Sequence, residues 1–169
     1  MTKENILFTH SFKSKIGTIR IASTSKGLAI LTLPGESGQY FKDLIKKNYP
    51  NWKTERGGSI NRQVEKQIEE YLNGKLKKFT IKLDWQTTPF REKALKQIAK
   101  IPYGKTKTYG EIAKAIGNSK ASRAVGSANA TNKIPIIIPC HRVLASNGLG
   151  GYGGGLELKK KLLKIEGAI

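Results

Sequence analysis

The sequence predicts a two-domain α/β protein, with an α/β unit over residues 1–85 and a mostly helical unit over residues 86–169. Three observations support this fold class. Short stretches of alternating apolar residues, separated by turn residues, open the chain and are typical of a strand meander. Stretches with apolar residues at helical spacing follow them. The second half contains capped helical stretches around a glycine turn, the pattern of a helix-turn-helix.

The first half predicts a small α/β domain. Lys26-Gly27 and Pro34-Gly35 supply turns between apolar stretches, and Gly74 supplies a helix end. The expected elements are strands at 6–12, 18–22, 28–33 and 79–83 and helices at 39–47 and 60–72. Its only aspartates, Asp43 and Asp84, lie in no catalytic motif, so we expect this half to be a structural support.

Helix starts are well marked in the second half. Residues 84–88 form the expected connector, and Thr88-Pro89 combines a capping hydroxyl with a proline at the first helical position. Thr108 followed by Glu111 three residues later predicts a capping box for the next helix, which Gly117-Asn118 ends.

The following helix is expected to begin at Ser119 or Lys120 and to run through Ala128. Small residues dominate it, and Arg123 alone projects from their flat face. Two interpretations remain open. A small-residue helix can approach DNA closely with Arg123 projecting from it, or it can be a buried helix whose Arg123 simply points to solvent.

Charge is the strongest global signal. The chain has 31 Lys and Arg against 12 Asp and Glu, a formal net charge of +19. Such an excess favours polyanions, nucleic acid above all. A solvated lysine-rich surface is the alternative, although thermophile proteins of that kind usually balance lysine with glutamate.

Several classes of protein are excluded or disfavoured. One cysteine permits no internal disulfide, and with only two histidines nothing in the spacing predicts a metal site or a cofactor. We expect no membrane segment and no signal peptide, and hence a cytoplasmic protein.

The single cysteine lies in Pro139-Cys140-His141-Arg142, after an apolar run at 136–138 that predicts a buried strand. A lone cysteine is more often a buried hydrophobe, but a neighbouring histidine and arginine both favour a thiolate. Adjacent residues of a strand point to opposite faces, so either the backbone turns here or a water relays the proton to His141. Glu166 is a candidate to orient that histidine.

The glycine-rich segment 148–153 matches G-x-G-x-x-G, but a dinucleotide site is rejected. No second strand follows to complete the βαβ unit that such a motif requires. We expect the glycines to form a flexible loop beside the cysteine.

Ile138-Pro139-Cys140-His141-Arg142-Val143 resembles the active-site signature of the O6-alkylguanine-DNA alkyltransferases, also called methylated-DNA–protein-cysteine methyltransferases. Further segments match in the same order, densely over residues 85–168. They are 102–113, similar to the first part of the family's helix-turn-helix; 122–126, similar to its recognition helix; and 162–167, similar to its last helix. Residues 1–85 match only loosely, as a ribonuclease-H-like fold.

The resemblance implies DNA repair by transfer of an alkyl group to the cysteine, once per molecule. The implied catalytic residues are Cys140 as acceptor, His141 as base through a water, Glu166 orienting it, Asn132 as a hinge and Tyr109 assisting base rotation. The implied DNA contacts are Arg123, which fills the place of the extruded base, with Tyr109, Ser122, Ala124 and Gly126. The implied pocket residues are Tyr152, Gly153, Val143 and Pro135.

The implied partner is double-stranded DNA carrying O6-alkylguanine, with O4-alkylthymine open as a second lesion. We expect a monomer without an obligate protein partner. Two residues depart from the family pattern. Lys133 replaces a proline that often follows the hinge asparagine, and Gly153 replaces a serine common at that position. Both bear on substrate range.

Three other functions remain as alternatives. A non-catalytic damage sensor would have tryptophan in place of Cys140. A thiol hydrolase would need an oxyanion hole and leaves the charge unexplained. A helix-turn-helix regulator would bind a specific sequence without needing Cys140.

Overall fold

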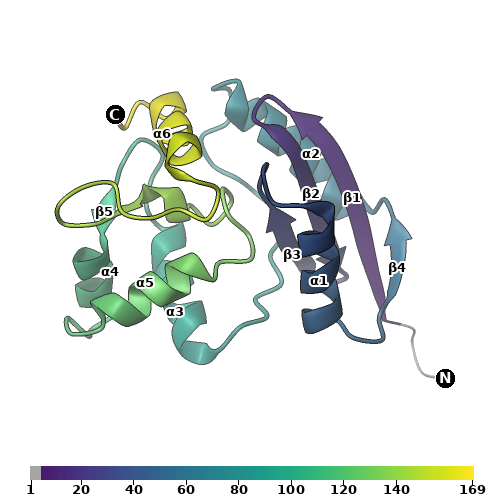
Figure 1. Ribbon diagram of the computed structural model, residues 1–169, viewed down its shortest axis with the longest axis horizontal. Helices are drawn as coiled ribbons and strands as arrows, with labels where there is room; N and C mark the ends of the chain where they lie inside the picture. The colour runs from purple at the N-terminus through teal and green to yellow at the C-terminus, as the bar shows by residue number, and fades with distance from the viewer. Residues whose placement is uncertain (1–4) are drawn as a thin grey trace. The chain divides into compact units, whose positions relative to one another are not determined.

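The computed structural model describes residues 5–169, and the chain divides into two compact units between Trp85 and Gln86 (Figure 1). The first unit contains β1 (Ile6–Ser14), β2 (Gly17–Thr24), β3 (Gly27–Thr32), α1 (Gly38–Asn48), β4 (Lys53–Arg56) and α2 (Ser59–Leu72). The second contains α3 (Pro89–Ala99), β5 (Lys107–Thr108), α4 (Tyr109–Ala115), α5 (Ser122–Ala130), the 3₁₀ turn η1 (Cys140–Arg142), β6 (Val143–Leu144) and α6 (Leu156–Ile165).

A four-stranded sheet in the order β3-β2-β1-β4 forms the centre of the first unit. β1 to β3 are antiparallel neighbours, and β4 runs parallel to β1. Helices α1 and α2 cover opposite faces of this sheet (Figure 1). Alternation along the strands explains this, because Leu7 and Ala22 pack with Phe41 of α1 while Ile19 and Ile21 point to the other face.

The sequence missed strand β4. Its four residues, Lys53–Arg56, are polar and mostly exposed, so neither apolar alternation nor length marks them as a strand. They form one through parallel pairing with β1, from Ile6 opposite Lys53 to Thr9 opposite Arg56. Pairing between residues so far apart along the chain leaves no local pattern.

The predicted strand at 79–83 is wrong, because only Leu83 forms a bridge there, to Leu28 of β3. The side chain of Gln67 explains the loss. Its amide donates to Thr80 Oγ1 at 2.7 Å and its carbonyl accepts from the Thr80 backbone N–H at 2.9 Å. A backbone donor held by a side chain cannot join a sheet ladder.

Both predicted helix starts are present in the second unit. Thr88 caps α3, which has Pro89 at its first turn. Thr108 and Glu111 form the complete capping box of α4. The next helix, α5, begins at Ser122 rather than at Ser119 or Lys120, because residues 118–121 are used in a turn closed by Ala121 N–H donating to Asn118 O at 3.0 Å.

The predicted strand at 136–138 is also wrong. Ile136 has a φ of +72°, a conformation that is strained for a β-branched residue. Asn132 holds the turn, since its Oδ1 accepts from Ile134 N at 3.0 Å and its Nδ2 donates to Ile138 O at 3.0 Å. The apolar run is therefore a tight buried turn, and it delivers the chain directly into η1.

The structure contains, among residues 5–169, no helix with the length and apolar character needed to cross a membrane.

Candidate active site

Cys140 lies at the first position of the 3₁₀ turn η1, immediately after Pro139. The residue is a free cysteine and only 5% exposed. Its carbonyl accepts from Asn129 Nδ2 of α5 at 3.4 Å. The backbone therefore turns at Cys140, and the cysteine is tied directly to α5.

The Cys140 thiol is protonated at neutral pH. Burial raises its pKa to about 11, although a hydrogen bond from the Asn132 side chain and the positive charge of Lys159 both lower it. The thiol therefore differs from the exposed, low-pKa thiolates of redox enzymes. It needs a base to become a nucleophile.

His141 and Glu166 form a buried pair whose chemistry suits a base and its orienting group. His141 Nε2 lies 2.7 Å from Glu166 Oε2, and both side chains are fully buried. Burial lowers the pKa of His141, with the Glu166 carboxylate acting in the opposite direction. A neutral ring that donates Nε2–H to the carboxylate has Nδ1 as its basic nitrogen. The structure thus brings together the two residues that the sequence paired.

Arg142 belongs to the same cluster, which the sequence did not show. Its Nε donates to Glu166 Oε1 at 2.8 Å and its second amino group to Glu166 Oε2 at 3.0 Å. Its remaining amino group donates to Ile101 O at 2.7 Å. The fork explains how a buried carboxylate stays ionised beside the histidine.

Lys159 is a second residue that the sequence missed. Its side chain is fully buried in α6, and Nζ donates to the carbonyls of Val143 at 2.8 Å, Leu149 at 2.5 Å and Gly151 at 3.1 Å. Burial lowers its pKa to about 8, so it remains mostly protonated at neutral pH. It fixes the glycine-rich loop to α6 and places a positive charge near Cys140. Nothing in the local sequence distinguishes it from the neighbouring lysines.

Tyr109 is the first residue of α4, and its ring lies beside α5 and the glycine-rich loop. A Cβ added at Gly126 of α5 would be 4.0 Å from its ring, and one added at Gly150 would be 3.3 Å from its hydroxyl oxygen. Burial raises the pKa of Tyr109, while a hydrogen bond with the Asn129 side chain lowers it. A side chain at Gly150 would therefore crowd the Tyr109 hydroxyl, whereas Gly126 is only in ordinary contact with the ring.

Helix α5 has a buried side and an exposed side. Val125 and Ala128 are fully buried, while Arg123 and Ala124 are exposed. The predicted contacts Ser122 and Gly126 are partly buried at the edge of the exposed side. Each of the two interpretations of this helix is therefore partly right. The helix packs into the core through small residues on one side, and Arg123 projects from the other side.

The predicted pocket residues differ in burial and in their distance from other groups. The Tyr152 ring lies edge-on to the His141 ring, with centroids 6.5 Å apart. Val143 is fully buried directly after η1, and Pro135 is buried in the turn held by Asn132. Gly153 is exposed, and a Cβ there would have no heavy atom within 4 Å. Within residues 5–169, no three His, Cys, Asp or Glu side chains gather as a metal site would require.

Family models match both units of the chain. The model described as 6-O-methylguanine DNA methyltransferase, DNA binding domain, matches residues 89–168, and that described as its ribonuclease-like domain matches residues 7–85. The chain belongs to the 6-O-methylguanine DNA methyltransferase family. This membership confirms the resemblance seen in the sequence and the predicted two-part fold class.

Individual relatives of this family cover nearly the whole chain. A methylated-DNA–protein-cysteine methyltransferase of Methanosarcina mazei is 46% identical over 95% of this chain and 97% of its own. The OGT of Mycobacterium tuberculosis, solved in complex with DNA, matches with a TM-score of 0.81 and 35% identity over 95% of this chain and 93% of that one. The O6-methylguanine-DNA methyltransferase of Pyrococcus kodakaraensis matches with a TM-score of 0.72 and 30% identity, over 95% and 99% of the two chains.

The thiol environment predicts a characteristic pH profile. The rate at which iodoacetamide alkylates Cys140 should rise about tenfold per pH unit from pH 7 to 9, because only the thiolate reacts and its pKa lies near 11. Mass spectrometry follows the reaction without ambiguity, since the chain has one cysteine. Circular dichroism at each pH controls for unfolding. A rate that levels off below pH 8 would show a free low-pKa thiolate instead.

Proposed function

We propose that this protein repairs alkylated DNA by transferring the alkyl group from O6 of guanine to Sγ of Cys140. The observation that carries the proposal is the buried His141–Glu166 pair directly following the buried cysteine, with Nε2 and Oε2 2.7 Å apart. A cysteine, a base and an orienting carboxylate are what nucleophilic catalysis by a thiol requires. The family's relatives carry the name of this activity.

The reaction is a displacement at an sp³ carbon. The thiol loses its proton to His141 through a water, and Glu166 stabilises the imidazolium that forms. The S–C bond forms as the C–O6 bond breaks, and the electron pair goes to the guanine. The proton held by His141 then passes to the guanine, so the products are a thioether on Cys140, neutral His141 and unmodified guanine. Because thiol exchange does not reopen a thioether, each molecule acts once.

Guanine O6 lies inside the duplex stack, so the nucleotide must leave the helix to react. Arg123, exposed on α5, is the side chain that fills the vacated place and offsets part of the unstacking cost. Tyr109 lies beside α5 and the glycine-rich loop, where it donates a hydrogen bond to the extruded base. The bound DNA of the Mycobacterium tuberculosis relative supports a duplex partner for this chain. A single copy of the chain carries all these groups.

The two departures from the family pattern affect the lesion that is accepted. Gly153 offers no hydroxyl, so its backbone N–H is the donor available to the base there. Lys133, in the place of a proline, anchors the hinge differently, since its amine donates to Gln86 O at 2.6 Å. We assign O6-alkylguanine as the main lesion and keep O4-alkylthymine as a second substrate to be assayed beside it.

Duplex DNA with one O6-methylguanine tests the proposal. Intact and peptide mass spectra should show one added methyl group on the Cys140 peptide and never more than one per protein. Cys140→Ala should abolish the transfer and keep the binding. Tight binding to the lesion without any mass gain would contradict the transfer and favour a damage sensor, while binding confined to one undamaged sequence would favour a regulator.

Arg123 should matter only for DNA substrates. Arg123→Ala should slow transfer from the methylated duplex by about tenfold or more, the equivalent of at least ~1.4 kcal/mol, because extrusion is no longer compensated. Transfer from free O6-benzylguanine, which needs no extrusion, should keep its rate. Lys120→Ala, which removes an exposed charge just before α5, is the matched control. Equal losses with both substrates would assign Arg123 to the fold instead.

A further inference from the structure

The first unit is basic in its own right, and the alkyl transfer makes no use of that charge. Residues 1–85 contain 16 Lys and Arg against 8 Asp and Glu. Every residue of the proposed reaction lies in the second unit. The excess positive charge of the first unit therefore needs a separate explanation.

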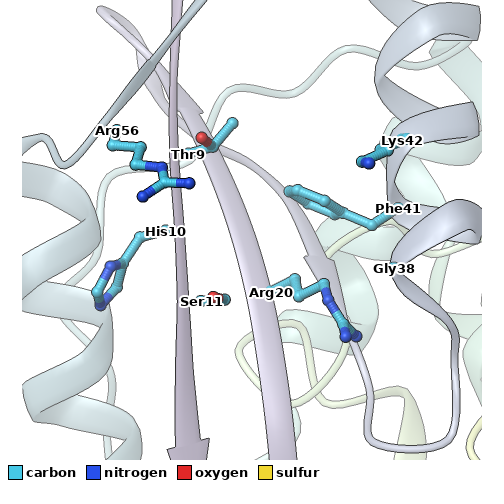
Figure 2. A pocket seen from close by; sticks show the side chains of 8 residues that line it. All are labelled: Thr9, His10, Ser11, Arg20, Gly38, Phe41, Lys42 and Arg56. Atoms are coloured by element: carbon cyan, nitrogen blue, oxygen red, sulfur yellow. The ribbon is translucent and has the colours of Figure 1, made fainter.

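A hollow of about 450 Å³ lies on this unit, where β1, β2, β4 and α1 meet. Three basic side chains line it, Arg20, Lys42 and Arg56, together with the hydroxyls of Thr9 and Ser11. None of its lining residues is acidic. Figure 2 shows the three basic side chains arranged around the strands, with the Phe41 ring between Lys42 and the sheet.

Strand register brings these groups to one face of the sheet. Thr9 pairs with Arg56 across β1 and β4, and Ser11 pairs with Arg20 across β1 and β2. Thr9 and Ser11 are two residues apart, so they share a face, and their partners share it with them. Helix α1 packs on that same face and contributes Lys42.

Arg20 is fixed at the beginning of α1. Its guanidinium donates to Glu36 O at 3.2 Å, and a Cβ added at Gly38 would lie 3.5 Å from its Nε. The first turn of α1 has no acidic residue, so the positive end of the helix dipole and the guanidinium act in the same direction. Two independent sources of positive potential therefore converge on the hollow.

His10 takes no part in this charge, although it borders the hollow. Figure 2 shows its ring turned away from Phe41, and its Nε2 lies 3.3 Å from Glu65 Oε1 of α2. The anion-binding groups are thus two guanidinium groups, one ammonium group and two hydroxyls. Guanidinium, ammonium and hydroxyl groups are the usual partners of phosphate oxygens.

We propose that this hollow binds a backbone phosphate of nucleic acid and gives the first unit a DNA contact of its own. Lys42 and Arg56 are exposed at its rim, and Phe41 is the one apolar side chain in its lining. Sites for free small molecules usually enclose their ligand with several apolar walls. A contact to one phosphate of a long polymer needs no enclosure, and it positions the protein without reading sequence or damage. The contact goes beyond the proposed alkyl transfer and does not depend on it.

The test uses the whole chain and an undamaged duplex of about 30 base pairs, ~100 Å long at 3.4 Å per step. Binding is measured by fluorescence anisotropy across a KCl series for wild type, Lys42→Gln/Arg56→Gln and the matched control Lys75→Gln/Lys78→Gln. The control removes the same charge from exposed residues after α2. The hollow variant should bind several-fold more weakly, and its slope of log K against log salt should fall by about 0.9, one phosphate contact. The control should keep the wild-type slope.

Transfer from free O6-benzylguanine is measured on the same samples. An unchanged rate in both double variants shows that the fold and the active site are intact, so that the salt slope reports on the hollow alone. Equal loss of slope in hollow and control variants would overturn the proposal in favour of diffuse charge. An unchanged slope, with inorganic phosphate raising the melting temperature of wild type but not of the hollow variant, would assign the hollow to a free anion and overturn the DNA contact.

Discussion

The buried carboxylate of Glu166 is the interaction on which the second unit depends. It accepts from His141 and from two nitrogens of Arg142, and its Oε1 lies 3.4 Å from the Gly104 backbone N–H. A carboxylate with this burial is stable only when it is fully paired, because an unpaired buried charge costs several kcal/mol. The last helix, the turn before the helix-turn-helix and the active-site turn therefore form one connected structure. Loss of any one partner would change the surroundings of the buried His141 ring.

The same buried surroundings explain how Cys140 stays unreactive in the absence of substrate. Cys140 is buried and protonated, while the Asn132 side chain, the Lys159 charge and the backbone N–H groups of Cys140 and His141 favour the deprotonated form. The thiol is thus inert until a substrate reaches it, which suits a protein that reacts once. Asn129 of α5 donates to the Cys140 carbonyl and is hydrogen-bonded to Tyr109 of α4, so α5 and Cys140 lie within one hydrogen-bonded region.

Many elements of the fold and the site could be predicted from local sequence. The two wrongly predicted strands have a common cause. The caps of α3 and α4 involve residues three positions apart, so Thr88 and the Thr108–Glu111 pair were visible in the sequence. The strands expected at 79–83 and 136–138 fail because Gln67 and Asn132 take backbone groups that a ladder would need. The sequence does not single out Lys159, because it differs from the neighbouring lysines only in being buried. A polar side chain that binds backbone atoms in this way leaves no periodic pattern in the sequence.

The protonation state of His141 is the most direct test of the proposed proton path. In that path, His141 is the residue that links the Glu166 carboxylate to the protonated thiol of Cys140. Long-range ¹H–¹⁵N correlation spectra of the whole protein at pH 7 distinguish the two neutral tautomers and the imidazolium. Since burial lowers the pKa of His141 and Glu166 Oε2 lies 2.7 Å from Nε2, the ring should be neutral with its proton on Nε2. The signals that disappear in His141→Gln belong to His141, and those that remain belong to His10. A proton on Nδ1, or an imidazolium at pH 7, would contradict the role given to Glu166 and with it the proposed path of the thiol proton.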